Sequence, residues 1–107
     1  MRQKVEQYFK ELYEKIDKDI ESFTVEWRQY EALAQIQFKD DFYLFIVFSW
    51  SDEDCTVEFM IGDENAVIQP RHIDKVEVAV SAMKLAYRMA LEKFTCLQPS
   101  SPSPGGR

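Results

Sequence analysis

Histidine, cysteine and glycine are scarce in this sequence, which has one, two and three of them among 107 residues. A structural zinc site needs about four ligands, and His72, Cys55 and Cys96 are too few to build one. Two of the three glycines lie close to the C-terminus, so the chain has no glycine-rich loop for a phosphate. No serine or cysteine has a recognisable catalytic base. We therefore predict a protein without metal, cofactor or catalytic residues, which is not an enzyme.

Basic residues and long apolar runs are also in short supply. Lys and Arg number 13 against 19 Asp and Glu, and the net charge is −6. This balance argues against direct binding of nucleic acid, whose phosphates require clustered Lys and Arg. The longest apolar run is far shorter than the roughly 18 to 20 residues of a membrane-spanning helix. We expect no membrane segment.

Cysteine usage and the N-terminal residues both bear on location. Two cysteines make no disulfide framework and fit a reducing compartment, although a bond between them stays open. We interpret Cys55, on the apolar face of a predicted strand, as a small buried hydrophobe rather than a nucleophile. The first residues, MRQKVEQYFKEL, lack the apolar segment and cleavage site of a signal peptide. We expect a soluble, cytoplasmic protein.

What the sequence does contain is enough apolar material for one core. Hydrophobic residues make up 46% of the chain and aromatic residues 14%, which suits one α+β domain at 1–97. The remainder, 98–107, reads QPSSPSPGGR, and we predict a disordered tail. Its PxxP pattern is a weak polyproline signal that a Ser/Pro composition readily produces.

Apolar spacing predicts helices at both ends of the domain. In residues 4–20, apolar side chains recur every three or four positions. The period returns at about 72–95, where we expect a main stripe centred near Val76 and Met83. A second apolar stripe lies on another side of this helix and contains Val78, Ala82, Leu85 and Met89. The first helix, as its lateral neighbour, could cover part of this second stripe.

Between the helices, alternating residues predict strands at 22–30, 31–39, 42–50 and 55–61, with a short fifth strand at 66–68. The short connections favour antiparallel hairpins. We therefore predict an α-β-β-β-β-α fold, in which a meander of four to five strands packs against the terminal helices.

The third predicted strand, FYLFIVFSW, is apolar on both faces. If the helices cover the larger set of its side chains, Tyr43, Phe45 and Val47 point outward. Either the sheet twists so that a loop or the tail covers these residues, or they form an interface. Our candidate partner-binding residues are these three together with Val78, Leu85 and Met89 of the last helix. A homodimer is the default assembly.

Acidic residues gather at the predicted turns, and we consider them a candidate acidic surface: Asp40, Asp41, Asp52, Glu53, Asp54, Asp63 and Glu64. Solvated turns are the simplest interpretation, and their spacing does not match a calcium-binding EF-hand loop. Binding of a divalent cation and contact with a basic partner are the two alternatives. His72, beside Arg71 at the start of the last helix, is interpreted as a tolerated polar residue rather than part of an anion site.

Two functions remain. The first is a small acidic protein-binding domain, an inhibitor, adaptor or chaperone whose partner is another protein, possibly with a basic surface. In general profile the chain is similar to secretion chaperones, toxin-immunity proteins and phage-encoded inhibitors, a likeness of size, charge and element order that identifies no residues. The alternative is a small-ligand-binding or weakly catalytic domain with an apolar pocket between sheet and helices, lined by Trp27, Trp50, Phe59 and Tyr87.

Overall fold

The polypeptide begins with a helix, runs through four consecutive strands and returns to a helix. The computed structural model describes residues 1–97, so the predicted tail at 98–107 lies outside the described residues. The main elements are α1 (Arg2–Ile16), β1 (Ser22–Trp27), β2 (Glu31–Phe38), β3 (Phe42–Trp50), β4 (Cys55–Gly62) and α2 (Val76–Lys93). The short 3-10 turns are η1 (Asp17–Asp19), η2 (Lys39–Asp41) and η3 (Pro70–His72).

The four strands form one antiparallel sheet in the order β1-β2-β3-β4. The predicted α-β-β-β-β-α meander is therefore confirmed. The short fifth strand predicted at 66–68 is not formed, because this segment folds back as a loop. Ala66 has a φ of 60° there, and the Asp63 amide donates to the Val67 carbonyl at 2.8 Å.

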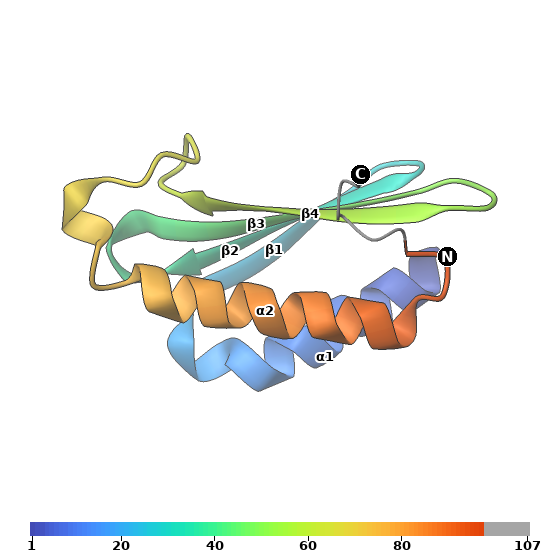
Figure 1. Cartoon of the computed structure of the whole chain (residues 1–107), viewed down its shortest axis with the longest axis horizontal. Coiled ribbons are helices and arrows are strands. Elements are labelled where there is room, and N and C mark those ends of the chain that lie inside the picture. The colour runs from blue at the N-terminus through green and yellow to red at the C-terminus, as the bar shows by residue number, and fades with distance from the viewer. Residues whose placement is uncertain (98–107) are drawn as a thin grey trace, which may run out of the picture.

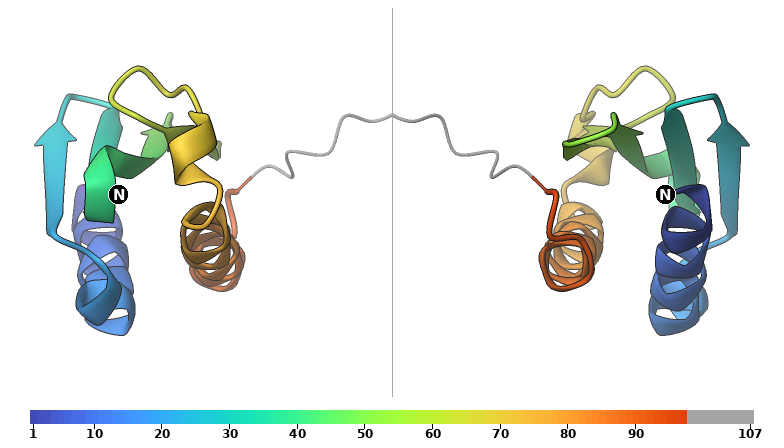
Figure 2. Two further views of the ribbon diagram at one scale, coloured as in Figure 1. Left: turned by 90° about the vertical axis from the view of Figure 1, so that its left-hand side faces the viewer. Right: turned by 90° about the vertical axis from the view of Figure 1, so that its right-hand side faces the viewer.

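Both helices lie on the same side of the sheet, which gives a two-layer molecule (Figures 1 and 2). The core lies between the layers. On β3, the alternate residues Phe42, Leu44, Ile46 and Phe48 are completely buried there, and burying a side chain of this size is worth about 1.5 to 3 kcal/mol. Their fully buried neighbours from β2 and α1 include Ile36, Val5, Tyr8 and Leu12. Among residues 1–97, no helix or strand packs on the opposite sheet face.

The buried side of α2 is centred on small residues. The buried residues of this helix are Ala79, Ala82, Ala86, Met89 and Ala90, whereas Val76 and Met83 are only partly buried at its border. The predicted centre of the buried stripe, near Val76 and Met83, is therefore wrong. The buried stripe is rotated around the helix axis by part of a turn from that position. Alanines allow close approach: the buried Tyr8 hydroxyl of α1 donates a 2.7 Å hydrogen bond to the Ala86 carbonyl of α2. Burial also raises the pKa of the Tyr8 phenol.

A tight loop connects β4 to α2. A Cβ atom on Gly62 would collide with the backbone of Ala66 and Val67, so a glycine is required there. The Asp63 carboxylate accepts the amides of Asn65 and Val67 at 2.9 and 3.1 Å. These hydrogen bonds lower the pKa of Asp63.

Candidate functional site

The sheet face that points away from the helices carries the outward side chains of β3. Tyr43, Phe45 and Val47 alternate with the buried residues of this strand and are each partly exposed. Their predicted orientation is confirmed. The rings of Tyr43 and Phe45 stack with centroids 5.6 Å apart and an interplanar angle of 15°.

Two further apolar residues join these three on the same face. The register places Leu33 of β2 opposite Val47, and Met60 of β4 opposite Phe45. We call the five residues the open-face patch: Leu33, Tyr43, Phe45, Val47 and Met60. Leu33, Phe45, Val47 and Met60 help to line a shallow hollow of about 360 Å³. Leu33 and Met60 were not among the predicted partner-binding residues, although both are apolar residues in the otherwise polar phase of their strands.

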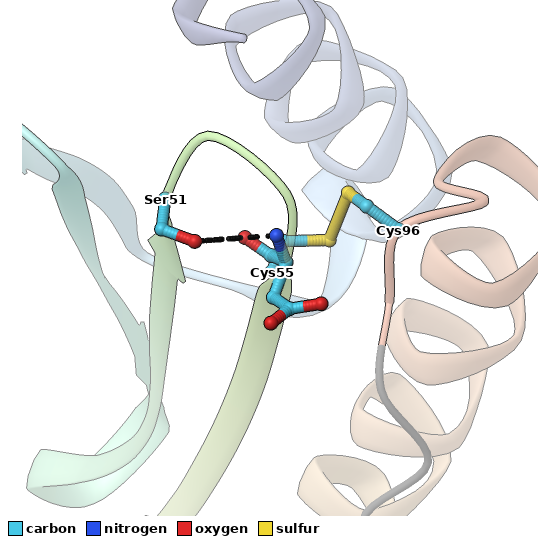
Figure 3. The surroundings of a disulfide bond; sticks show 4 residues. Ser51, Cys55 and Cys96 are labelled. Atoms are coloured by element: carbon cyan, nitrogen blue, oxygen red, sulfur yellow. Dashed lines mark hydrogen bonds between the residues drawn. A yellow bond between two sulfur atoms is a disulfide. The ribbon is translucent and has the colours of Figure 1, made fainter.

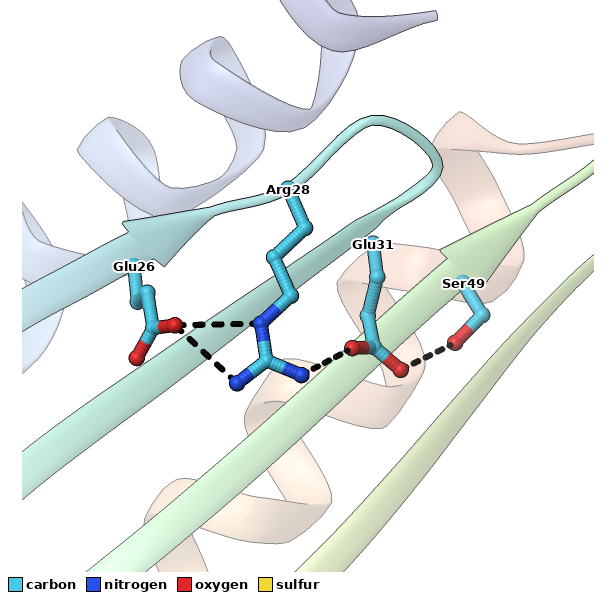
Figure 4. Close-up of polar contacts among 4 residues, drawn as sticks. All are labelled: Glu26, Arg28, Glu31 and Ser49. Carbon is cyan, nitrogen blue, oxygen red and sulfur yellow. Dashed lines mark hydrogen bonds and ion pairs between the residues drawn. The ribbon is translucent and has the colours of Figure 1, made fainter.

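Polar and charged side chains surround the open-face patch. Across the sheet, Glu58 lies opposite Val47 from β4, and Glu26 lies opposite Leu33 from β1. Near the β1–β2 turn, Arg28 pairs with Glu26 at 3.0 Å and with Glu31 at 3.2 Å. The Ser49 hydroxyl donates to Glu31 at 3.4 Å. Figure 4 shows the contacts among Glu26, Arg28, Glu31 and Ser49, on the side of the sheet away from the helices.

We call the residues Glu26, Arg28, Glu31, Ser49 and Glu58 the rim of the patch. The rim is mainly acidic, and Arg28 is its basic member. Glu26, followed by Glu31, raises the pKa of Arg28. Exposed ion pairs of this kind contribute little to stability. Their effect is to surround an uncharged centre with charge, which is the arrangement of many protein interfaces.

The second stripe of α2 mainly faces α1. Met89, one of our candidate partner-binding residues, is buried at 7% exposure and is therefore not available to a partner. Val78 and Leu85 are still partly exposed and border a groove of about 320 Å³ together with Ile16 near the end of α1. A salt bridge links the two helices, with Lys93 Nζ of α2 at 3.1 Å from Glu11 Oε2 of α1. The open-face patch, in contrast, has no described element over it.

The acidic turns have local structural roles. The β2–β3 turn requires positive φ angles of 61° and 58° at Asp40 and Asp41, and aspartate tolerates this conformation better than most residues. Asp40 also pairs with Lys75 at 2.7 Å, and Lys75 lowers its pKa, chiefly by hydrogen bonding.

The register places Asp40–Asp41 and Asp63–Glu64 at the same end of the sheet, as expected. In the part of the chain that the structure describes, however, no three His, Cys, Asp or Glu side chains form a group that could hold a metal ion. The divalent-cation alternative therefore has no cluster of ligands at this end.

The third acidic turn leads into a disulfide bond. Between β3 and β4, the Ser51 amide donates to the Asp54 carbonyl at 2.8 Å. The next residue, Cys55, is bonded to Cys96, which follows α2 (Figure 3). The Cys55 amide donates to the Cys96 carbonyl at 3.1 Å. Cys55 is buried, as predicted, and the bond between the two cysteines, which the sequence left open, is present.

His72 lies inside the protein rather than at its surface. Its ring is completely buried and packs on Phe42 with centroids 4.8 Å apart. Nδ1 accepts the Gln69 amide at 3.1 Å, while Nε2 has no hydrogen-bonding partner among the described residues. Because the ring is buried, it is not placed to bind an anion from solvent. His72 instead caps the turn before α2 through the hydrogen bond at Nδ1.

The aromatics of the alternative ligand pocket do not gather in one place. Phe59 and Tyr87 make an edge-to-face contact with centroids 6.2 Å apart and border a hollow between β4 and α2. Trp27 packs on Phe9 of α1, and Trp50 lies near Phe48. The expected pocket is therefore reduced to the Phe59–Tyr87 hollow.

Neither helix in residues 1–97 is long and apolar enough to cross a membrane.

Comparison with other proteins gives no further guide to function. No family model matches this chain, and no similar curated protein or solved structure was found.

Proposed function

We propose that this chain is a non-catalytic protein-binding domain that acts as an inhibitor, adaptor or chaperone of a partner protein. The observation that carries the proposal is the open-face patch. Five large side chains adjoin one another on a sheet face that no described element covers. Contiguous apolar surface of this kind on a water-exposed sheet is typical of interaction sites.

We propose a second copy of the chain as the occupant of the open-face patch. The patch has an uncharged centre, and two sheets can pack face to face about 10 Å apart around a two-fold axis. Four strands spaced about 4.8 Å apart, with about seven residues each, give a face on the order of 500 Å². Such an area corresponds to a small interface. We therefore expect a dimer that dissociates in the micromolar range.

The acidic rim gives this dimer a characteristic dependence on salt. Two copies would bring Glu26, Glu31 and Glu58 of each chain near those of the other, and like charges oppose association. Added salt screens this repulsion and should strengthen the dimer. A basic partner on the same face would respond in the opposite way, because salt would weaken its attraction to the rim.

The test is the molar mass in solution, measured by light scattering over a range of protein concentrations. Val47→Glu places a carboxylate at the centre of the open-face patch, and we expect it to abolish the dimer. Leu91→Glu is the matched control, because Leu91 is 48% exposed on α2 and lies off the sheet. A wild-type mass of 12.6 kDa at every concentration and salt would refute the dimer.

The disulfide bears on where the domain works. Stable disulfides persist in oxidising compartments, whereas cytosolic ones are usually transient. The Cys55–Cys96 bond therefore favours an oxidising compartment over the cytoplasmic location expected from the sequence. Alkylation of free thiols in cells, followed by mass spectrometry, would show which state the protein has where it acts.

A further inference from the structure

Strand β4 forms one edge of the sheet. The strand register shows which of its backbone N–H and C=O groups point toward β3 and which point outward. The Trp50 amide donates to the Tyr30 carbonyl, away from β4, and Trp50 lies opposite Cys55. Because antiparallel pairs alternate, the backbone groups of Cys55 point outward from the sheet. Its amide bonds to Cys96, as this phase requires.

The same alternation turns the N–H and C=O groups of Val57, Phe59 and Ile61 toward the edge. Within residues 1–97, none of these outward groups has a backbone partner. The edge nevertheless accepts a strand at its beginning, where Leu97 forms a parallel bridge with Cys55. The positions beyond this bridge present an unfinished ladder of donors and acceptors.

An apolar hollow of about 440 Å³ runs beside this unfinished ladder. Its lining comes from β4 and α2 and consists of Val57, Glu58, Phe59, Met83, Lys84 and Tyr87. Phe59, Met83 and Tyr87 are each partly exposed. A strand added to the edge would direct every second side chain toward these three residues.

The remaining side chains of an added strand would lie on the other face of β4, where Glu58 stands between Thr56 and Met60. Glu58 is exposed on the other face of β4. Asp52–Asp54 precede this strand, and Asp63–Glu64 follow it. The one basic group in the lining is Lys84 of α2, on the helix side. The local charge therefore favours basic residues on the Glu58 side of a bound strand.

We propose that the β4 edge binds an extended peptide segment of a partner protein by adding it to the sheet as a further strand. Apolar side chains of this peptide fill the hollow between β4 and α2, and basic side chains alternate with them to face Glu58. Backbone hydrogen bonds from Val57, Phe59 and Ile61 supply affinity, and the hollow and the acidic groups supply selectivity.

The opposite edge of the sheet lacks this combination of features. The aromatic residues of β1 pack on α1: Phe23 and Trp27 contact Phe9, and the Arg2 guanidinium lies 4.6 Å from the Trp27 ring centroid. The Arg28 amide donates to the Glu31 carbonyl, so the backbone groups of Arg28 point toward β2. Val25 lies three positions earlier, and its amide therefore points outward from the sheet as well. Val25 is therefore an internal control.

This inference rests on the proposed protein-binding function but uses the β4 edge rather than the centre of the open-face patch, and Glu58 borders both. The two can consequently fail separately. If the wild type is monomeric and the peptide still binds at β4, the proposed dimer fails and the edge site stands. If Val47→Glu is monomeric and the edge binds nothing, the dimer stands and the edge site fails.

The experiment uses the full chain with a fluorescein-labelled peptide of about seven residues that alternates lysine and valine. Two control peptides carry glutamate in place of lysine, or N-methyl groups on alternate amides. Binding is followed by fluorescence anisotropy and located by amide hydrogen exchange. We expect the lysine–valine peptide to slow exchange at Val57, Phe59 and Ile61, leave Val25 unchanged and bind more tightly than either control.

A pair of variants isolates the backbone hydrogen bond. Phe59→Ala and Phe59→Pro both remove the ring, but only proline removes the outward N–H, and proline is tolerated where that group faces away from the sheet. We expect Phe59→Pro to bind the peptide about three- to tenfold more weakly than Phe59→Ala, the range for one net hydrogen bond. Glu58→Lys should remove the preference for the lysine peptide over the glutamate peptide.

Four results would overturn the proposal. The first is no binding of the lysine–valine peptide, and the second is binding without slower exchange at Val57 and Phe59. The third is slow exchange at both amides without peptide that becomes fast after truncation at Leu97, because the occupant would then be the chain's own C-terminal segment. The fourth is slow exchange that appears only with rising protein concentration, which would identify a second copy at this edge.

Discussion

The Cys55–Cys96 disulfide should account for a large part of the stability of this domain. It joins the first residue of β4 to the segment after α2 across a sequence separation of 41. Closing a loop of this length in the unfolded chain lowers its entropy enough to stabilise the folded state by about 4 kcal/mol. The total stability of a domain is usually about 5 to 15 kcal/mol, so the bond is expected to matter well beyond its immediate surroundings.

The assay is urea unfolding of the oxidised and reduced wild type, followed by circular dichroism. With a denaturant dependence of about 1 to 2 kcal/mol per molar urea, reduction should lower the midpoint by about 2 to 4 M. Cys96→Ser should unfold near the reduced midpoint and should not respond to reductant. Reduction should also speed amide exchange at Cys55, whose N–H bonds to the Cys96 carbonyl.

Equal midpoints for oxidised and reduced protein would refute this reasoning. The same conclusion would follow if mass spectrometry after alkylation found two free thiols in protein purified without reductant. A midpoint change accompanied by loss of the two-state transition would instead mean that α2 and β4 no longer unfold together.

Three further substitutions test how the core and the loops are built. Gly62→Ala should destabilise the fold by about 1 to 3 kcal/mol in urea unfolding, because the new methyl group meets the backbone of the following loop; an unchanged midpoint would contradict this. Tyr8→Phe should cost about 0.5 to 1.5 kcal/mol, because it removes the hydrogen bond to the Ala86 carbonyl; the near-ultraviolet spectrum would report any wider repacking. Asp63→Asn should remove a pH-dependent part of the stability, because the folded-state pKa of Asp63 is lowered from 3.8. That contribution is complete above the unfolded pKa and is lost as the pH falls through the lower folded value, so thermal unfolding of the two proteins should converge in acid. A constant difference at every pH would be inconsistent with this account.

The alternation of apolar residues was sufficient to predict the sheet. Glu31–Phe38 and Cys55–Gly62 each bury one face, Ser22–Trp27 partly buries one, and Phe42–Trp50 is apolar on both. The period of two assigned Tyr43, Phe45 and Val47 to the open face without knowledge of the neighbours. Leu33 and Met60 were missed because each is a single apolar residue in a polar phase, and only the strand register brings them beside Phe45 and Val47.

The buried face of α2 was harder to predict because size and burial diverge. Large residues dominated the sequence pattern, but the helix packs through its alanines, where the α1 side chain of Tyr8 reaches the α2 backbone. For the second stripe, with Val78, Leu85 and Met89, the sequence left two interpretations open, partial coverage by the first helix or an interface, and the structure shows that α1 covers Met89. A helical projection shows which residues share a side but not which neighbour covers it.

Contacts between distant segments were outside the reach of a local pattern. The bond between Cys55 and Cys96 depends on where the chain returns after α2, and two cysteines carry no spacing signal for it. Glu11 of α1 pairs with Lys93 of α2, 82 positions away in the sequence. The aspartates of the β2–β3 turn were noted for their charge, whereas their positions also demand a left-handed backbone.

Contact between the open-face patch and a second copy of the chain can be tested in solution. The most direct measurement is the relaxation of methyl groups by a soluble paramagnetic agent at low and high protein concentration. We expect the methyl groups of Leu33, Val47 and Met60 to become shielded as concentration rises, while those of Leu91 stay accessible. Equal relaxation of these groups at all concentrations would contradict it.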